Sequence, residues 1–207
     1  MNLKRRDFIK QFSCACCAPF FLTSCAEVAI TNRKQLSFVS EESINKQAKQ
    51  AYNSIKKTEN IIRSGNQVEM LNEVGKKVTT SVEKYFNEMG QFETLKNYEW
   101  EYILIDEPET LNAWCMPGGK IAFYTGILDI TENEDGMASV MGHEIAHAVA
   151  KHSLERASQS LALKVGTTIL DIALEGALSS SSADDYLVNL GLTLPFNRLQ
   201  ESEADYL

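Results

Sequence analysis

The stretch that decides the fold is His143-Glu144-Ile145-Ala146-His147, in which two histidines lie four residues apart with a glutamate directly after the first. On a helix, four residues rotate the chain by ~400° and advance it by ~6 Å, so both imidazole rings lie on one face. Glu144 lies ~100° round from His143, close enough to act as a base beside a bound ion but badly placed to bind it. Two ligands, a base and an open coordination position are the parts that zinc hydrolases use.

Histidine is rare in this chain, which makes the pairing informative. The chain has only 3 histidines, and two of them flank one glutamate at metal-ligand spacing. The alternative interpretation is a core helix with two incidental histidines. Further motifs elsewhere in the chain argue against it.

A protein zinc site needs a third ligand. His152 follows His147 by five residues, so on a continuous helix it points ~140° away from that ring. Neither Ala150 nor Lys151 is a glycine that would break the helix. We therefore expect His152 on the surface or packed against another helix, and Glu155 in an i,i+4 ion pair with Lys151.

The segment Glu201-Ser202-Glu203-Ala204-Asp205 offers carboxylates for the missing ligand. On a helix Glu201 and Asp205 share one face, and Glu203 points about 160–200° away from them. One carboxylate on the shared face can bind zinc while the other holds a ligating histidine from behind. The alternative is an acidic, solvated helix end.

Together, three blocks resemble the HtpX-type gluzincin metallopeptidases, above all their bacterial periplasmic lipoprotein members and the mitochondrial inner-membrane stress protease. The blocks are residues 141–150 around the two histidines, residues 201–205, and Asn112-Ala113-Trp114-Cys115-Met116-Pro117-Gly118-Gly119-Lys120-Ile121-Ala122-Phe123-Tyr124 with the residues up to Leu128. The resemblance covers roughly residues 95–207.

The resemblance implies a role for each site residue. His143, His147 and Glu201 would bind one Zn²⁺ per chain, Glu144 would be the catalytic base, and Asp205 would support the site from behind. The strand at 119–124 would be the sheet edge on which an extended peptide lies as an added strand. The implied substrate-binding residues are Asn112, Gly118, Gly119, Lys120, Ile121 and Ala122.

The N-terminal residues 1–24 are predicted to be a signal peptide, with paired arginines before a short apolar stretch. Arg5-Arg6 resembles a twin-arginine export signal, and an ordinary secretory segment is the alternative. Leu22-Thr23-Ser24-Cys25 resembles a bacterial lipobox, so we expect a lipid on Cys25 that holds the protein on the periplasmic side of a membrane, the outer membrane being favoured. A chance cysteine is the competing view. Residues 25–40 would then be a lipidated tether.

The net charge and the cysteine count limit which functions and cross-links this protein can have. The formal net charge is −8, and removing residues 1–24, which carry four Lys or Arg and one Asp, leaves about −11. So acidic a domain argues against nucleic-acid binding. Of the five cysteines only Cys115 remains after processing and lipidation, so we expect no intramolecular disulfide.

Hydrophobic patterns predict an α+β, mostly α fold, and the resemblance implies a zincin-like domain over residues 41–207 with a small sheet beside the histidine helix. Predicted helices span 41–62, 68–89, 126–130, 136–159 and 161–178, with strands at 99–105 and 120–124. Charges within 161–178 indicate a buried helix, a second membrane contact being the alternative. The chain stops six residues after Glu201, where family members continue, so we expect further sequence at this end.

The predicted function is a zinc-dependent endopeptidase that hydrolyses proteins of the cell envelope, in protein quality control. The alternative is an envelope chaperone or assembly factor with a little-used zinc site. An intact Glu144 favours the enzyme, since a structural zinc site has no use for a base.

Overall fold

The computed structural model describes residues 25–160 and 197–207. The predicted signal peptide, with its paired arginines, and the predicted helix at 161–178 lie outside these residues. Within the described part, no helix combines the length and the apolar character needed to cross a bilayer.

A four-stranded sheet forms the centre of the domain. Its spatial order is β3 (Ile61–Ile62), β4 (Glu101–Ile105), β6 (Lys120–Tyr124) and β5 (Ala113–Met116). β4 and β6 run parallel, and the other neighbouring pairs are antiparallel. Since β6 lies between β4 and β5, both of its edges are paired.

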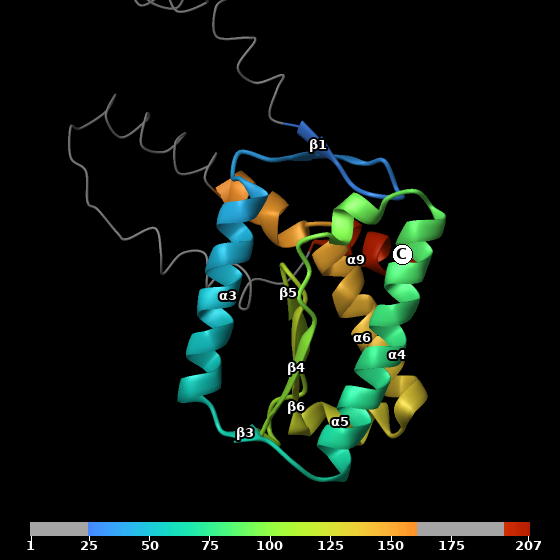
Figure 1. The fold of residues 1–207 in the computed structure, drawn as a ribbon. Coiled ribbons are helices and arrows are strands. Elements are labelled where there is room, and N and C mark those ends of the chain that lie inside the picture. The colour runs from blue at the N-terminus through green and yellow to red at the C-terminus, as the bar shows by residue number, and fades with distance from the viewer. Residues whose placement is uncertain (1–24, 161–196) are drawn as a thin grey trace, which may run out of the picture.

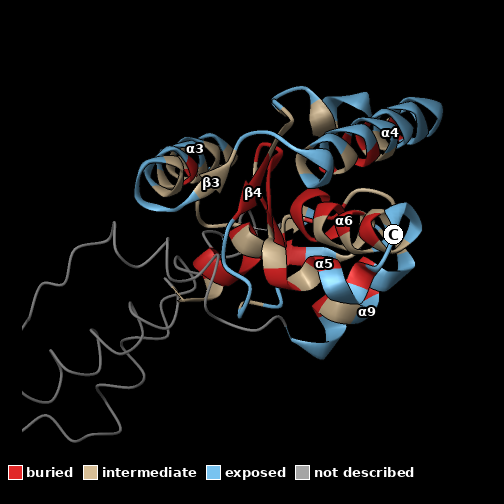
Figure 2. Cartoon of the chain, turned by 90° about the horizontal axis from the view of Figure 1, so that it is seen from below, coloured by how far each residue is buried: buried red, intermediate tan, exposed pale blue. Residues whose placement is uncertain are grey.

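Helices cover both faces of this sheet (Figure 1). α3 (Glu41–Thr58) lies on one face, and α4 (Asn66–Glu88) and α6 (Glu134–Val149) lie on the other. Viewed from below, the buried strands stand between the two helical layers (Figure 2). The short helix η1 (Phe92–Leu95) contacts α4, and α5 (Thr125–Thr131) and α9 (Arg198–Tyr206) contact α6. The predicted α+β, mostly helical class is confirmed.

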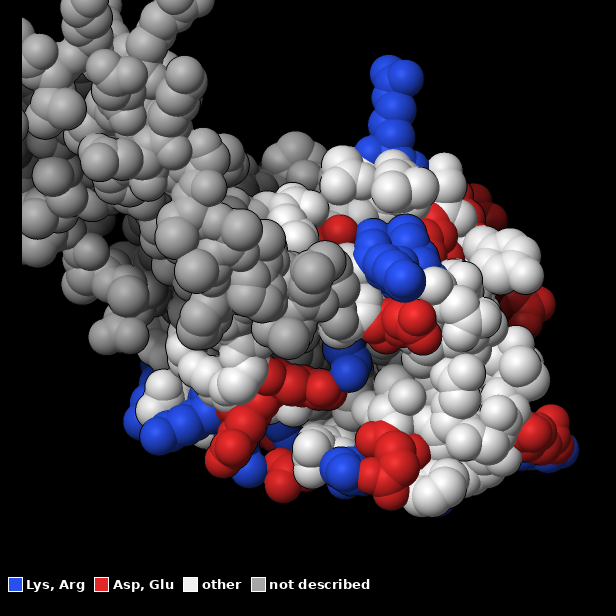
Figure 3. All heavy atoms as spheres, turned by 90° about the horizontal axis from the view of Figure 1, so that it is seen from above, with Lys and Arg blue, Asp and Glu red and all other residues white. Residues whose placement is uncertain are grey.

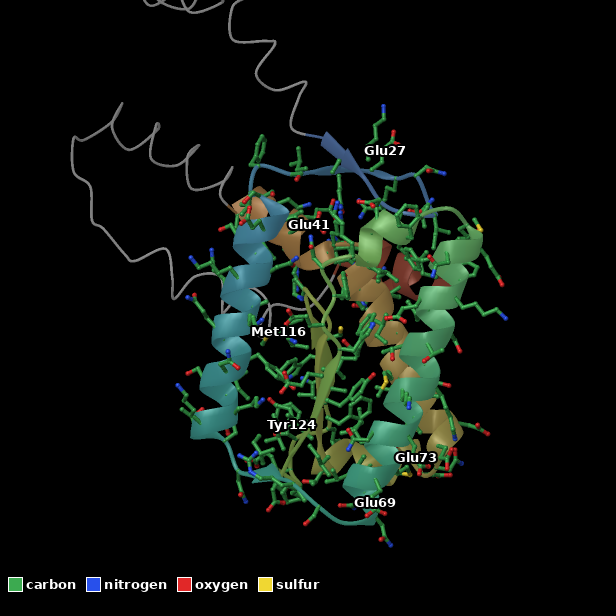
Figure 4. The ribbon with its side chains drawn as sticks, in the orientation of Figure 1. Glu27, Glu41, Glu69, Glu73, Met116 and Tyr124 are labelled. Atoms are coloured by element: carbon green, nitrogen blue, oxygen red, sulfur yellow. The ribbon has the colours of Figure 1, made fainter. Side chains whose placement is uncertain are left out.

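Each face of the sheet has its own apolar core. On the α3 side, Tyr52 meets Trp114 edge-on with ring centroids 6.1 Å apart, and Met116 and Tyr124 point toward the same helix (Figure 4). The larger core lies on the other face, where Phe123 packs among apolar side chains of α4 and α6. A strand that is buried on both faces needs apolar residues throughout, which explains the composition of β5 and β6.

The N-terminal segment folds onto the domain instead of forming a free tether. β1 (Cys25–Glu27) and β2 (Lys34–Leu36) make an antiparallel hairpin that lies across one end of the domain (Figure 1). Val28, just after β1, is 1% exposed and Gln35, in β2, is 3% exposed, so the hairpin contributes buried residues to the fold. Seen from above, this end of the molecule carries acidic and basic side chains close together (Figure 3).

The histidine helix ends earlier than its pattern predicts. α6 stops at Val149, Lys151 adopts a left-handed backbone with φ of 59°, and a new helix begins at residue 152. A residue with a Cβ pays for this conformation, and here the Lys151 Nζ is held by the Glu41 carboxylate at 2.7 Å. The prediction of a Lys151–Glu155 ion pair is wrong, because the helix breaks at Lys151, and Glu155 pairs with Arg33 instead.

Replacing either of two helical glycines by alanine should change the stability of the protein, in opposite directions at the two positions. An added Cβ at Gly75, in α4, would lie 2.6 Å from the Tyr102 ring, whereas at Gly142, in α6, it would meet nothing within 4 Å. Gly75→Ala should therefore destabilise the protein by about 1–3 kcal/mol through overpacking. Gly142→Ala should stabilise it by ~1 kcal/mol, the helix-propensity difference. Thermal unfolding followed by circular dichroism tests both, and melting temperatures that shift in the same direction would contradict this packing.

Candidate metal centre

Two helices bring three metal-ligating side chains to one point. His143 and His147 lie on one face of α6, and Glu201 lies in the first turn of α9. One ligand atom from each lies within 4.8 Å of the others. The Nε2 atoms of the histidines are 3.0 Å apart, and the Glu201 carboxylate lies 3.4 Å from His143 Nε2 and 3.8 Å from His147 Nε2.

These separations fit zinc. A tetrahedral zinc with bonds of ~2.1 Å has ligand atoms ~3.4 Å apart, and the three distances lie on either side of that value. Two imidazoles and one carboxylate form a donor set found in catalytic zinc sites, which keep a fourth position open. The residues present therefore fit one zinc ion.

Local sequence fixes where each helix begins and so where its ligands point. Asn133 caps α6 by accepting from the backbone N–H groups of Asp135 and Gly136. Asn197 and Gln200 form a reciprocal capping box at the start of α9, one residue before Glu201. The acidic residues 201–205 are thus part of a capped helix packed on α6, in which Glu203 is buried while Glu201 and Asp205 stay partly exposed to solvent.

Each of the two histidines on α6 also contacts a polar side chain through its other ring nitrogen, Nδ1. His143 Nδ1 lies 2.9 Å from the exposed Asp205 carboxylate, as expected from the shared face of Glu201 and Asp205. His147 Nδ1 instead lies 2.9 Å from Nδ1 of His152. Such contacts orient metal-binding imidazoles and select their tautomer.

Of the two places expected for His152, the structure has it packed against another helix, α9, and not on the surface. Its side chain is fully buried, and its Nε2 lies 2.9 Å from the Glu203 carboxylate. The expected direction of ~140° from His147 assumed a continuous helix, and the break at Lys151 turns His152 back toward that ring. The sequence analysis therefore missed His152 and Glu203 as parts of the centre. The one available signal was that the chain's third histidine follows the motif so closely.

Burial keeps the inner histidines neutral. It lowers the pKa of His147 to about 3, and repulsion from the protonated forms of His152 and His143 and from Arg156 would lower it further. Burial also lowers the pKa of His152, although the Glu203 carboxylate opposes the shift. Neutral imidazole is the form that binds a metal.

Glu144 has the opposite shift. Burial, followed by the negative charge of Glu201, raises the pKa of the Glu144 carboxyl to about 8. A bound cation adds positive charge beside this carboxylate and lowers that pKa, so the group becomes a base at neutral pH. Burial raises the pKa of the Cys115 thiol, on β5, and the negative charge of Glu144 raises it further.

The strand expected to be the peptide edge, β6, is not a free edge of the sheet. β6 is paired on both sides, and Lys120, Ile121 and Ala122 are at most 5% exposed, so an added strand cannot pair with them. The carbonyls of Gly118 and Gly119 are likewise taken by backbone N–H groups at the start of β4. Of the expected substrate-binding residues, only Asn112, just before β5, is exposed. Within the described residues β5 pairs only with β6, which makes β5 the edge beside α6.

A groove of about 570 Å³ opens between α4, α6 and α9, with His143 and Asp205 in its wall. Most of the lining is apolar. The contributing side chains include Val78, Val82, Phe86, Ala146 and Val149.

A helix carrying two histidines and a glutamate, with a third ligand from a later helix and a sheet edge alongside, defines a zinc metallopeptidase of the gluzincin class. The chain belongs to peptidase family M48, and the sequence model of this family matches residues 76–207. It is 31% identical over 195 residues to the mitochondrial metalloendopeptidase OMA1 of Schizosaccharomyces pombe, covering 91% of this chain and 52% of that protein.

Other relatives are similar over shorter stretches. The OMA1 metalloendopeptidase of Arabidopsis thaliana is 36% identical over 114 residues, covering 55% of this chain and 22% of that protein. The metalloprotease YcaL of Escherichia coli is 30% identical over 97 residues, covering 46% of this chain and 37% of that protein. This chain thus spans about half or less of the length of these relatives.

Proposed function

We propose that this protein is a zinc-dependent endopeptidase that hydrolyses peptide bonds of cell-envelope proteins in quality control. The observation that carries the proposal is the geometry at α6: three ligand atoms lie at zinc spacing, and Glu144 stands beside them without being one of them. Membership of a peptidase family supports the reaction class.

The residues divide the work of hydrolysis. His143, His147 and Glu201 would hold zinc, which when bound polarises the scissile carbonyl and favours attack by water at neutral pH. Glu144 takes a proton from the attacking water and later delivers one to the leaving amine. Asp205 accepts a hydrogen bond from His143 Nδ1 and so leaves Nε2 of that ring to the metal.

Substrate would lie along the outer edge of β5. The carbonyl of Asn112 accepts from the N–H of Tyr124, and backbone groups alternate sides along an antiparallel strand. Ala113 and Cys115 therefore direct their N–H and C=O groups away from β6, toward an incoming strand. An extended peptide paired there passes beside Glu144, whose carboxylate is close to Cys115.

We place the protein on the periplasmic side of a bacterial envelope, held by a lipid on Cys25 and favouring the outer membrane. The support is the signal and lipobox pattern before residue 26. The folded hairpin that starts at Cys25 would set the domain close to the membrane surface rather than on a long tether.

Metal removal tests the proposal. Full-length protein incubated with a strong zinc chelator should lose hydrolysis of an unfolded protein substrate such as casein, and added Zn²⁺ should restore it. Elemental analysis of the untreated protein should give about one zinc per chain. Hydrolysis that survives complete zinc removal would contradict the proposal.

A further inference from the structure

A chain of polar contacts runs from the back of the metal centre to the N-terminal hairpin. His147 meets His152, His152 Nε2 meets Glu203 Oε2 at 2.9 Å, and Arg33 Nε donates to the same Glu203 oxygen at 2.7 Å. The side chains of His147, His152 and Glu203 are at most 6% exposed, and that of Arg33 is 19% exposed. Arg33 lies outside residues 76–207, the part of the chain that matches the family M48 sequence model.

The contacts fix which nitrogen of each ring carries hydrogen. A carboxylate has no hydrogen to donate, so His152 donates to Glu203 from Nε2. The Nδ1 of this neutral ring is then an acceptor, and His147 must donate to it from its own Nδ1. The Nε2 of His147 is left as a lone pair facing His143 and Glu201, as a metal requires.

Arg33 holds the Glu203 oxygen that faces His152, while the hydroxyl of Thr31, in the same hairpin, donates to the other oxygen. The Nη1 and Nη2 of Arg33 each donate to the Glu155 carboxylate at 2.9 Å, while its Nε serves Glu203. Glu155 belongs to the helix that begins at His152, and Glu203 belongs to α9, so one guanidinium joins the two helices behind the centre. Gln200 adds a bond from α9 to Glu155 at 2.9 Å.

We propose that Arg33 is a positioning residue of the metal centre. It keeps Glu203 against His152, and that contact holds His147 in the tautomer that offers Nε2 to the metal. The inference rests on the metal-binding role of His147 in the proposed function, but not on peptide hydrolysis. A lysine cannot replace Arg33, because a single ammonium cannot contact both carboxylates in this forked geometry.

Zinc affinity of full-length protein in detergent is the first test, measured by competition with a chelator of known affinity. Arg33→Ala and Arg33→Lys should weaken zinc binding by about 10–100-fold, the usual effect of losing a partner behind a ligand. Lys34→Ala is the matched control, since Lys34 is the next residue of the same hairpin and its side chain is exposed. It should bind zinc as the wild type does.

The tautomer itself is the second test. All 3 histidines of the chain belong to this cluster, so ¹⁵N imidazole spectra of metal-free protein report on the centre alone. Wild type and Lys34→Ala should show His147 protonated on Nδ1 and His152 on Nε2. Both Arg33 variants should show mixed tautomers at His147.

A purely structural role for Arg33 would lower the melting temperature of the metal-free protein and leave zinc affinity and tautomers of the folded protein unchanged. That result overturns the proposal, as does an equal loss of affinity in Lys34→Ala. If Arg33→Ala does not fold, Arg33→Lys decides, because it keeps the positive charge beside the carboxylates. Wild-type protein that binds zinc but hydrolyses no protein would contradict the proposed function alone.

Discussion

Glu144→Gln should reduce peptide hydrolysis by about 10²–10⁴-fold, the usual contribution of a general base, while zinc binding remains at the wild-type level. The amide keeps the size of the side chain but cannot take a proton from water. Glu144 is not one of the three side chains at ligand spacing, so its loss leaves the metal in place. Hydrolysis rates and zinc content measured on the same preparation test both halves of this prediction.

Without bound metal, the Glu144→Gln protein should be at least as stable toward unfolding as the metal-free wild type. Burial raises the pKa of Glu144 to about 8, which means that the charged form is disfavoured in the folded protein. An acid with a raised folded-state pKa costs stability at any pH above its unfolded pKa of ~4.3, and a neutral amide removes that cost. A strongly lowered melting temperature would show that lost activity came from unfolding.

Glu134→Gln is the matched control, because Glu134 is an exposed carboxylate in the first turn of the same helix. Its hydrolysis rate should equal that of the wild type. Wild-type hydrolysis in Glu144→Gln would contradict the assignment of the base. A Glu144→Gln protein that is inactive as a peptidase but still supports envelope assembly in cells would favour the chaperone role.

The helices and strands that have a regular hydrophobic pattern could be predicted from the sequence. Helical periodicity places α3 and α4 within a few residues of their observed bounds, and the strand at 120–124 matches β6. The pair His143 and His147 needs only helix geometry, which also narrows the third ligand to the face shared by Glu201 and Asp205; the choice of Glu201 came from the family resemblance. Signals of this kind are contained within single elements.

The features that the sequence analysis did not predict depend on backbone conformation and on tertiary contacts. Nothing in the residue types indicates that Lys151, rather than a glycine, takes the left-handed conformation, since the contact that holds it comes from Glu41. His152 enters the centre only because of that break. Arg33 contacts Glu203 across 170 residues, a separation that no local pattern reports.

Strand order is the other property that the sequence leaves open. The block 112–128 contains two strands joined by a turn, and either could be the edge. The parallel pairing of β6 with β4, set by the whole domain, makes β6 internal and leaves β5 outside. The peptide edge stays a prediction, and only the topology shows that β6 cannot be its strand.

Zinc affinity should fall by more than ~100-fold in Glu201→Ala, because loss of a ligand costs more than loss of a partner behind one. Asp205→Ala should have the smaller effect of about 10–100-fold, since Asp205 contacts His143 Nδ1 and not the metal position. Ser202→Ala, an exposed neighbour on the same helix, should change nothing. Chelator competition on the three variants measures the order.

The order of these effects separates a ligand from its support more firmly than any one value. If Glu201 binds the metal, its variant must be the weakest binder, and cobalt-substituted protein should change its visible spectrum because one donor atom has been replaced. If Asp205→Ala were weaker than Glu201→Ala, the carboxylate bound to the metal would be Asp205. Zinc bound at wild-type affinity in Glu201→Ala would move the third ligand off this residue, while His143 and His147 would keep their places on α6.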